Sequence, residues 1–215
     1  MTSYPSTIAA AVERESVIKK SRFIAHVVPV ASPEDADAVI ARLKKQFWDA
    51  RHNCSAQVTG TLGDRARSSD DGEPSGTAGV PMLEVLRRRE LTDVVAVVTR
   101  YFGGVKLGAG GLVRAYSSAV SEALDAAVVL DRMPLSQAIV AVPHSDAGRF
   151  DNLLRDWLDG RTGILGGTEY GADAVFEAWV GEDALAELEA DVAAWSSGAW
   201  RVVAGGVTRV IDVPR

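Results

Sequence analysis

Hydrophobic residues in the first part of the chain recur with two periods, that of a strand and that of a helix. Alternation of apolar and polar residues, or an unbroken apolar run, predicts strands at 8–15, 21–30, 54–61 and 94–98. Apolar residues at three- and four-residue spacing predict helices at 33–47, 81–91 and 111–128. The resulting order, β-β-α-β-α-β-α, indicates an α+β or split-βαβ sandwich.

The second part of the chain has a shorter pattern that is typical of one small domain. Strands are predicted at 135–142, 164–170, 174–180 and 200–213, and helices begin near Ser145 and Gly181. This β-α-β-β-α-β order predicts a ferredoxin-like fold. The charge balance shifts between the two parts: residues 1–132 contain 17 Lys and Arg against 16 Asp and Glu, and residues 133–215 contain 6 against 13. We therefore predict two domains, 1–132 and 133–215.

A glycine-rich segment joins the predicted strand 94–98 to the helix that follows it. Backbone N–H groups at a helix start have no partner within the helix, so with glycines in front of them they suit an anion or a phosphate-bearing polymer. Basic residues bracket the segment, and others lie in the polar loop before it. The predicted anion-binding residues are Arg65, Arg67, Arg100, Gly103, Gly104, Lys106, Gly108, Gly110, Gly111 and Arg114.

The glycine-rich segment matches no nucleotide-binding motif. It lacks the Gly-Lys-Ser/Thr ending of a P-loop, and its glycines are too loosely spaced for a dinucleotide-binding fingerprint. An alternative to anion binding is that the glycines only allow the loop to pack tightly, with the basic residues solvated around it. Both interpretations remain open from the residues alone.

Three carboxylates lie close together in the predicted loop 63–79, at Asp70, Asp71 and Glu73. Oxygen ligands suit Mg²⁺ or Ca²⁺, but this spacing matches neither a calcium loop nor a two-metal site. The alternative is a loop closed by helix caps and by salt bridges to Arg65, Arg67 or Arg100. We therefore predict no metal and no cofactor, and treat the acids as a polar site.

His52 and Cys54 lie two residues apart, so on a strand their side chains share one face. A Cys–His nucleophile would also need an orienting acid such as Asp49. Because no nucleophile-elbow motif or metal-ligand set accompanies the pair, we favour a packed cysteine and a hydrogen-bonded histidine. Tyr101 and Phe102 could stack on bases, although strand neighbours face opposite ways and one of the two is then expected in the core.

Composition narrows the class of protein only slightly. The content of 47% hydrophobic and 24% charged residues is that of an ordinary soluble globular protein, and no apolar run reaches the roughly 20 residues of a membrane span. The N-terminus lacks the basic and apolar blocks of a signal peptide, and a single cysteine allows no internal disulfide, so we expect a cytoplasmic protein. The acidic balance after residue 132 assigns any polyanion partner to the first domain.

Three ordered motifs make the chain resemble the YigZ/IMPACT family over about residues 16–130. They are Arg51-His52-Asn53-Cys54-Ser55-Ala56, the segment from Ser69 through Gly79, and the segment from Thr99 through Tyr116. The resemblance implies a ribosomal protein S5 domain 2-like first domain, followed by the small ferredoxin-like domain of the bacterial members. The pairing is similar to domains IV and V of elongation factor G.

The resemblance implies a function only in outline. Eukaryotic relatives act in translational control by binding a partner protein through an additional domain, so that mechanism is not carried over. Bacterial members are regarded as nucleic-acid- or ribosome-associated proteins by analogy of fold, which sets only a prior expectation. The family has no agreed catalytic residues. We therefore expect a non-enzymatic RNA- or ribosome-binding protein that regulates translation and contacts its partner through the first domain.

Two other functions are compatible with the same residues. An enzyme acting on a phosphorylated small molecule would hold phosphate in the glycine-rich loop and use Asp70, Asp71 and Glu73 as metal ligands or as acid and base. That hypothesis requires the two loops to converge on one concave pocket. A protein-interaction module would instead bind a partner protein through the exposed sheet of the second domain.

Overall fold

The computed structural model describes residues 4–215 of the protein, and the chain divides into two compact units. The first unit runs as far as Arg132 and also includes the last four residues, Asp212–Arg215; the second is Met133–Ile211. The sequence-based boundary would place those four residues in the second domain. They group with the first unit instead, where Asp212 pairs with Arg132 at 3.0 Å and Arg215 with Asp131 at 2.9 Å.

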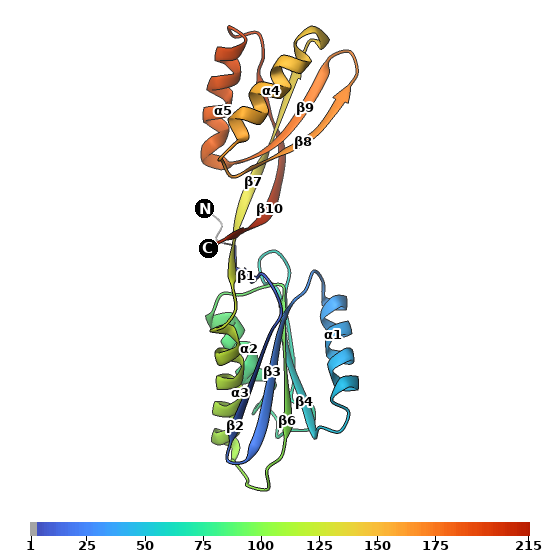
Figure 1. Ribbon diagram of the computed structural model, residues 1–215, viewed down its shortest axis with the longest axis vertical. Helices are drawn as coiled ribbons and strands as arrows, with labels where there is room; N and C mark the ends of the chain where they lie inside the picture. Colours follow the sequence, from blue (N-terminus) through green and yellow to red (C-terminus); the bar gives the residue numbers. More distant parts are fainter. Residues whose placement is uncertain (1–3) are drawn as a thin grey trace. The chain divides into compact units, whose positions relative to one another are not determined.

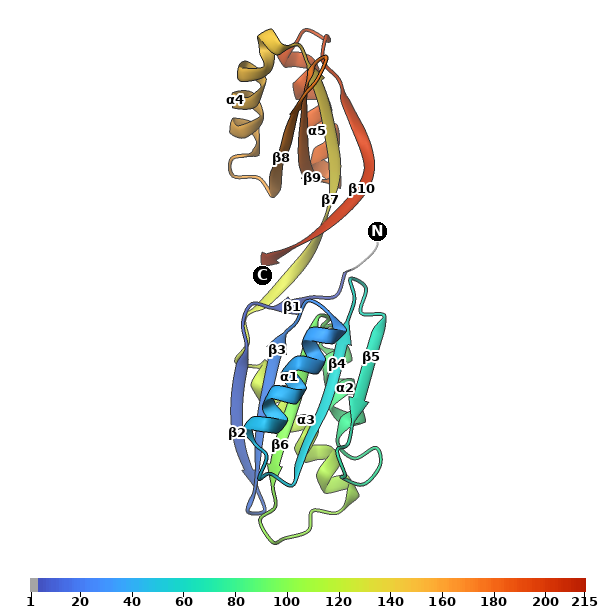
Figure 2. The same ribbon diagram turned by 90° about the vertical axis from the view of Figure 1, so that its right-hand side faces the viewer.

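The first unit is an antiparallel sheet with helices on both faces (Figure 1). The sheet has the order β2-β3-β6-β4-β5, which places β6 at its centre. Its strands are β2 (Val12–Ile18), β3 (Ser21–Pro29), β4 (His52–Thr59), β5 (Arg65–Ser69) and β6 (Val94–Tyr101). The short strand β1 (Thr7–Ile8) lies outside this sheet and pairs with residues 129 and 130. The helices are α1 (Pro33–Gln46), α2 (Gly79–Arg88) and α3 (Ala109–Leu124). Figure 2 shows α1 against one face of the sheet, with α2 and α3 behind the other.

The unbroken apolar run of β6 is explained by burial on both faces of the sheet. Val95 and Val97 pack with α1, whereas Val94 and Val98 belong to the larger core formed with α2 and α3. Because successive side chains of a strand alternate between faces, Arg100 points to the same side as Val98. Arg100 therefore lies at the end of the α2 and α3 face, next to the glycine-rich loop.

Two predicted elements of the first unit differ from the structure. The strand expected at 8–15 is divided into β1 and β2, which pair with different strands. The loop expected at 63–79 contains β5, which pairs with β4 from Thr59↔Arg65 to Ser55↔Ser69. β5 is an edge strand whose residues are mostly polar and exposed, so it lacks the apolar alternation that reveals a strand. The observed order is β-β-β-α-β-β-α-β-α.

The second unit is ferredoxin-like, with helices packed on one face of a sheet whose order is β10-β7-β9-β8. Its core is built around Phe150, whose ring packs edge-on against Phe176 and Trp200 at centroid distances of 4.9 and 5.4 Å. Its elements are β7 (Val129–Val142), η1 (His144–Asp146), α4 (Ala147–Leu158), β8 (Gly163–Tyr170), β9 (Ala174–Gly181), α5 (Glu182–Trp195) and β10 (Val202–Pro214). No helix among the described residues is long and apolar enough to cross a membrane.

Candidate functional site

The glycine-rich loop between β6 and α3 is held against the β2–β3 hairpin. The backbone N–H of Gly103 donates to Ser21 Oγ at 3.2 Å, and a Cβ added to Gly103 would lie 2.0 Å from the carbonyl carbon and oxygen of Lys20. A side chain therefore cannot be accommodated there. Gly108, the N-cap of α3, has φ +75°, a conformation that glycine adopts without strain. These two glycines place the first turn of α3.

The first turn of α3 opens onto a pocket of about 440 Å³. Gly108 supplies no side-chain cap and the first turn contains no acidic residue, so the positive end of the helix dipole lacks a negative partner there. The glycine-rich and carboxylate-rich loops both line this pocket, which meets the geometric condition set by the enzyme hypothesis. The charged and polar side chains that line it are Arg51, His52, Glu73, Arg100 and Lys106.

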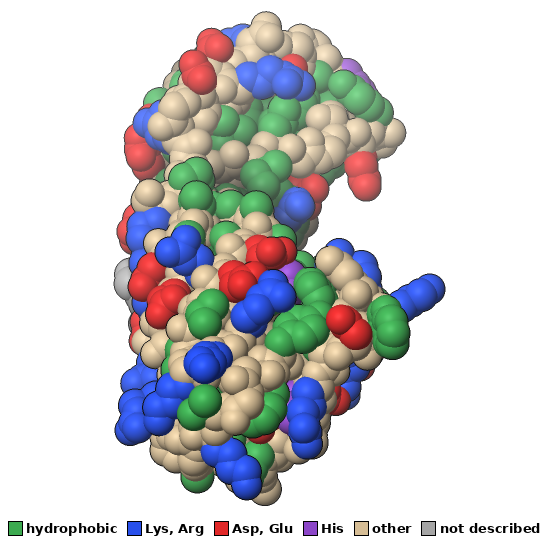
Figure 3. Space-filling model, turned by 60° about the horizontal axis from the view of Figure 1, so that its bottom comes forward, with side chains coloured by type: hydrophobic (Ala, Val, Ile, Leu, Met, Phe, Trp, Pro, Cys, Tyr) green, Lys and Arg blue, Asp and Glu red, His purple; other side chains and the backbone are tan. Residues whose placement is uncertain are grey.

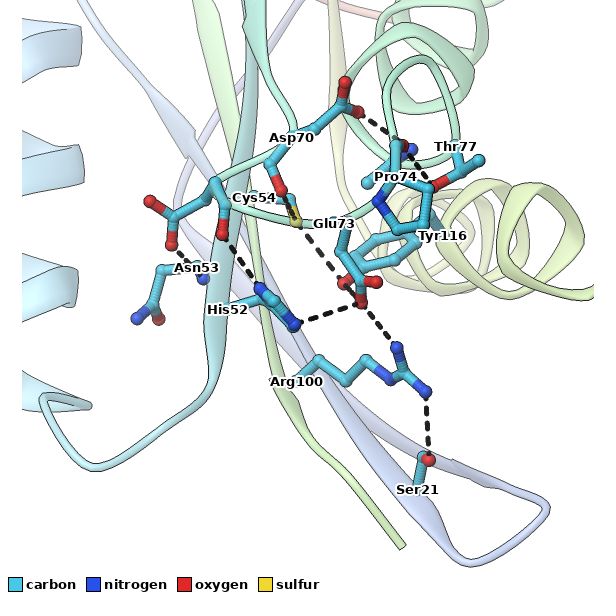
Figure 4. Close-up of polar contacts among 12 residues, drawn as sticks. Ser21, His52, Asn53, Cys54, Asp70, Glu73, Pro74, Thr77, Arg100 and Tyr116 are labelled. Carbon is cyan, nitrogen blue, oxygen red and sulfur yellow. Dashed lines mark hydrogen bonds and ion pairs between the residues drawn. The ribbon is translucent and has the colours of Figure 1, made fainter. Parts of the chain in front are cut away.

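Behind the pocket lies a network of buried polar side chains (Figure 4). The Glu73 carboxylate accepts hydrogen bonds from Arg100 Nη1 at 2.5 Å and from Tyr116 Oη at 2.8 Å. His52 Nε2 lies 3.9 Å from the same carboxylate. The side chains of Glu73 and Arg100 are only 4% and 6% exposed. At such burial an unpaired charge would be costly, and the two opposite charges neutralise each other.

Arg100, which the sequence predicts as a phosphate contact, is a buried ion-pair partner. Its Nη2 lies 3.4 Å from Ser21 Oγ, and its guanidinium lies over the rings of Phe23 and Phe102, 5.4 and 5.6 Å from their centroids. Its Nε is buried and has no hydrogen-bond acceptor among the described residues. Arg100 therefore lines the pocket with its charge already balanced and one donor unused.

Tyr116 is a member of this network that the sequence did not indicate. It is fully buried, and its hydroxyl lies 3.3 Å from Cys54 Sγ, which also contacts the Asp70 carbonyl oxygen at 3.0 Å. Burial raises the pKa of Cys54 to about 12, although its hydrogen bond with the Tyr116 hydroxyl acts to lower that pKa. Burial likewise raises the pKa of Tyr116. Because the thiolate is the reactive form, a raised pKa disfavours Cys54 as a nucleophile.

His52 and Cys54 both lie on β4, but their hydrogen bonds lead to different groups. His52 Nδ1 contacts the carbonyl oxygen of Asp71 at 2.8 Å, whereas the Cys54 thiol contacts the Tyr116 hydroxyl and the carbonyl oxygen of Asp70. Asp49, the acid considered as an orienting group, accepts a hydrogen bond from Tyr101 Oη at 2.9 Å. These contacts correspond to a packed cysteine and a hydrogen-bonded histidine rather than to a catalytic pair.

Asp70 and Asp71 fasten the carboxylate-rich loop. Asp71 accepts hydrogen bonds from Lys44 Nζ and from the Asn53 N–H, each at 2.6 Å. Burial acts to raise the pKa of both carboxyl groups, but the hydrogen bonds outweigh it and hold each pKa below its ordinary value. The donors to Asp70, at 2.8 to 3.0 Å, are the backbone N–H groups of Gly76, Ala78 and Gly79, at and just before the start of α2.

The three acids of this loop therefore point to separate partners. Asp70 binds backbone groups near α2, Asp71 binds Lys44, and Glu73 binds Arg100. Within residues 4–215, no three His, Cys, Asp or Glu side chains are grouped as a metal site would need. The observed contacts are those of a loop closed by a helix cap and by a salt bridge to an arginine.

The aromatic pair at the end of β6 differs from expectation. Neither side chain points into the core, because Tyr101 is half-buried and Phe102 is 44% exposed. β6 ends at Tyr101, so the strand alternation behind the expectation does not extend to Phe102. Phe102 instead lines the pocket, together with the apolar residues Pro74, Leu107 and Leu112.

Arg65 and Arg67, predicted to aid anion binding, do not line the pocket at α3. Both lie on the edge strand β5, where Arg67 forms an ion pair with Asp37 of α1. The prediction placed them in the polar loop 63–79 and expected them to aid the anion contact. Pairing of β5 with β4 fixes them at the sheet edge instead.

Arg114 lies near the main pocket but does not line it. With Lys19 it borders a second pocket of about 190 Å³, which also includes Gly111 of the first turn of α3. Leu107 lines both pockets, so the two are neighbours around the start of the helix. Of the predicted basic residues, Arg100 and Lys106 therefore line one hollow and Arg114 lines the other.

Five exposed basic residues gather around these hollows. Lys19 and Lys20 form the turn between β2 and β3, and the others line one or the other pocket. Among the residues that the structure describes, none of the five takes part in an ion pair. Figure 3 brings this end of the first unit forward and shows Lys and Arg side chains across its lower part. We call Lys19, Lys20, Arg51, Lys106 and Arg114 the basic end.

Arg51 was absent from the predicted anion-binding residues. In the sequence it appears only as the first residue of the motif that continues with His52 at the start of β4. β4 and β6 are antiparallel neighbours in which His52 is paired with Arg100. That pairing brings Arg51 to the end of the sheet from which the glycine-rich loop emerges, a consequence that required knowing the strand order.

Fold and site together define a two-domain α+β protein, in which an S5 domain 2-like unit with a basic-rimmed pocket precedes a ferredoxin-like unit. Residues 19–124 match the family model of the Impact N-terminal domain, and residues 140–199 match that of a domain of unknown function, DUF1949. The chain is 47% identical over 176 residues to IMPACT family member YvyE of Bacillus subtilis (strain 168), covering 82% of this chain and 79% of that protein. The chain therefore belongs to the IMPACT family.

Other relatives extend the comparison over nearly the whole chain. IMPACT family member YigZ of Escherichia coli (strain K12) is 35% identical over 198 residues, covering 91% of this chain and 95% of that protein. A crystal structure of a hypothetical protein is similar with a TM-score of 0.67 and 33% identity, covering 95% of this chain and 98% of that one. Protein IMPACT of Mus musculus is 35% identical over 99 residues, which is 42% of this chain and 29% of the mouse protein.

Proposed function

We propose that the protein is a non-enzymatic RNA-binding protein that acts in translation and binds RNA, free or within the ribosome, through the basic end. The observation that supports this proposal is the group of five exposed basic residues, without ion-pair partners in the described chain, around the uncapped N-terminus of α3. Helix N-terminal amides and unpaired cations both favour phosphate.

A polymer of phosphates suits this surface better than a single anion. The five cations are spread over two neighbouring hollows and a hairpin turn, so several phosphates can be contacted at once. Arg100, by contrast, adds no net charge because Glu73 balances it. The second part of the chain has an excess of acids, 13 against 6 basic residues, and would repel the same polymer.

The salt dependence of RNA affinity tests the proposal. For single strands, log K falls with log salt concentration with a slope of about −0.7 for each phosphate neutralised. We expect Arg51→Ala with Lys106→Ala to reduce the magnitude of that slope by about 1.4 and to weaken binding across RNA sequences.

The matched control removes two basic residues from the other end of the first unit. Arg65 lies at the start of β5 and Arg87 in the last turn of α2; both are exposed and outside any ion pair of the described residues. Arg65→Ala with Arg87→Ala changes the net charge equally and should leave the slope nearly unchanged. Equal slopes for both double variants would refute binding through the basic end.

A second candidate function is binding of a small phosphorylated molecule, because the glycine-rich and carboxylate-rich loops line one pocket. The acids of the carboxylate-rich loop already have other partners, since Asp70 caps α2 and Glu73 is bound by Arg100 and Tyr116. Titration with nucleoside monophosphates separates the candidates. Tight binding of a mononucleotide, with RNA failing to compete, would favour the small-molecule function over RNA binding.

A further inference from the structure

We propose that the pocket at the first turn of α3 receives the terminal nucleotide of a single-stranded RNA, with its terminal phosphate at the helix end and its base against Phe102. The inference rests on the proposed function, because it specifies which part of the RNA this pocket binds. Three features of the pocket carry it: unused donors, a closed inner wall and an apolar side.

Unused hydrogen-bond donors point to a phosphate. The N-terminus of α3 has neither a side-chain cap nor an acidic residue in its first turn. Independently, the Arg100 side chain is 6% exposed, lines the same pocket, and has an Nε without an acceptor among the described residues. Buried donors normally have partners, so the unpaired Arg100 Nε indicates a missing acceptor. The first-turn amides of α3, on the exposed residues Ala109 and Gly110, are open to the same ligand.

The charge and shape of the pocket favour a chain end over an internal phosphate. Glu73 balances Arg100, which leaves Arg51 and Lys106 as the cations without partners that line it. A terminal phosphate carries a charge of about −1.5 to −2, whereas an internal phosphodiester carries one negative charge. The buried Glu73, Arg100 and Tyr116 network closes the inner wall, so a chain that enters has no continuous way through.

The apolar side of the pocket suits a base. Phe102 is 44% exposed and lines the pocket with Pro74, Leu107 and Leu112. The Arg100 guanidinium lies over the Phe102 ring, 5.6 Å from its centroid. Stacking of a base on an aromatic ring tolerates any sequence, as a chain-end site requires. A volume of about 440 Å³ is within the range of small-ligand sites.

The neighbouring hollow gives the rest of the RNA a way out. Leu107 borders both pockets, and the second contains Lys19 and Arg114. The nucleotides that follow the bound end can therefore continue across Leu107 toward these two exposed cations. They would add salt-dependent affinity without distinguishing chain ends.

The test uses the full chain and four forms of one short single-stranded RNA: 5′-phosphorylated, 3′-phosphorylated, hydroxyl-ended and circular. Binding is followed by fluorescence anisotropy at fixed salt. We expect one phosphorylated form to bind about tenfold or more tightly than the hydroxyl-ended and circular forms, as charge-assisted hydrogen bonds to a phosphate imply. Lys106→Ala and Phe102→Ala should each reduce that preference, and Arg65→Ala should not.

The outcomes separate this inference from the proposed function. Equal, salt-dependent binding of all four RNAs would overturn the chain-end site and leave RNA binding standing. A preference that persists in both Lys106→Ala and Phe102→Ala would place the end elsewhere and also overturn it. No binding of any RNA would refute both proposals. Protection of the Cys54 thiol from alkylation confirms that each variant keeps its fold, because Cys54 is fully buried.

Discussion

Replacing Glu73 with alanine would leave the Arg100 guanidinium buried, with no carboxylate within ion-pair distance among the described residues. The side chains of the pair are 4% and 6% exposed and their atoms are 2.5 Å apart. The Tyr116 hydroxyl would lose its acceptor in the same variant. The perturbation therefore leaves one charge and one neutral donor unsatisfied in the core of the first unit.

The expected loss is large on the scale of domain stability. Removing one partner of a buried ion pair costs about 3–5 kcal/mol, and an unsatisfied buried hydroxyl adds about 1 kcal/mol. Domains are stable by roughly 5–15 kcal/mol, so Glu73→Ala should lose a substantial fraction of that free energy. Replacing both charges, as in Glu73→Met with Arg100→Met, should restore most of it, because a buried pair can be exchanged for apolar residues at little cost.

Cys54 makes the assay specific to the first unit. It is the single cysteine of the chain, it is fully buried, and it belongs to the core formed with α2 and α3. The rate of thiol alkylation at increasing urea concentrations therefore reports opening of this core. If Glu73→Ala shifts the free energy of opening by less than about 0.5 kcal/mol, or if the double variant is no more stable than Glu73→Ala, the buried-pair argument is wrong.

Further predictions concern the loop, the helix cap and the thiol. Gly103→Ala should destabilise the first unit by about 3 kcal/mol or more, because the added Cβ meets the Lys20 backbone at 2.0 Å. The control Gly148→Ala has open space around it in α4 and should be neutral or stabilising. Urea denaturation of both variants measures the difference. Asp70→Ala should cost about 1–2 kcal/mol at neutral pH. Folding lowers the pKa of Asp70, so its contribution to the free energy of unfolding is fully present above its unfolded pKa of about 3.9. That contribution disappears as pH falls through the pKa of the folded state. The stabilities of wild type and variant should therefore converge in acid denaturation. Cys54, with a pKa of about 12, should resist alkylation at pH 8 in the folded protein and react on unfolding.

The elements that the sequence predicted correctly have strong local signals. β6 is apolar on both faces and is followed by glycines, so a buried strand, a loop and a helix could be recognised without knowledge of their neighbours. The second unit shows the same clarity, because its strands and helices alternate in a recognisable order. β5 had no such signal, since its arginines and serines fit a loop as well as an exposed edge strand.

The site was less predictable because its contacts join residues far apart in the sequence. Glu73 is 27 residues from Arg100 and 43 from Tyr116. Its position beside the glycine-rich segment predicted Arg100 as a phosphate contact, but its buried pairing with Glu73 could not be foreseen, because that depends on where the carboxylate-rich loop folds. Tyr116 occupies a helix position that reads as ordinary core, and only the fold shows that its hydroxyl faces a carboxylate.

RNA phosphate bound where α3 begins lies against the backbone amides of Ala109, Gly110 and Gly111, so these amides report its binding most directly. In a heteronuclear NMR titration with a short phosphorylated single-stranded RNA, these amide signals should shift saturably, together with those of Lys106 and Gly108. The second unit should show little change. Saturable shifts confined to the second unit, with the first turn of α3 unmoved, would contradict the account.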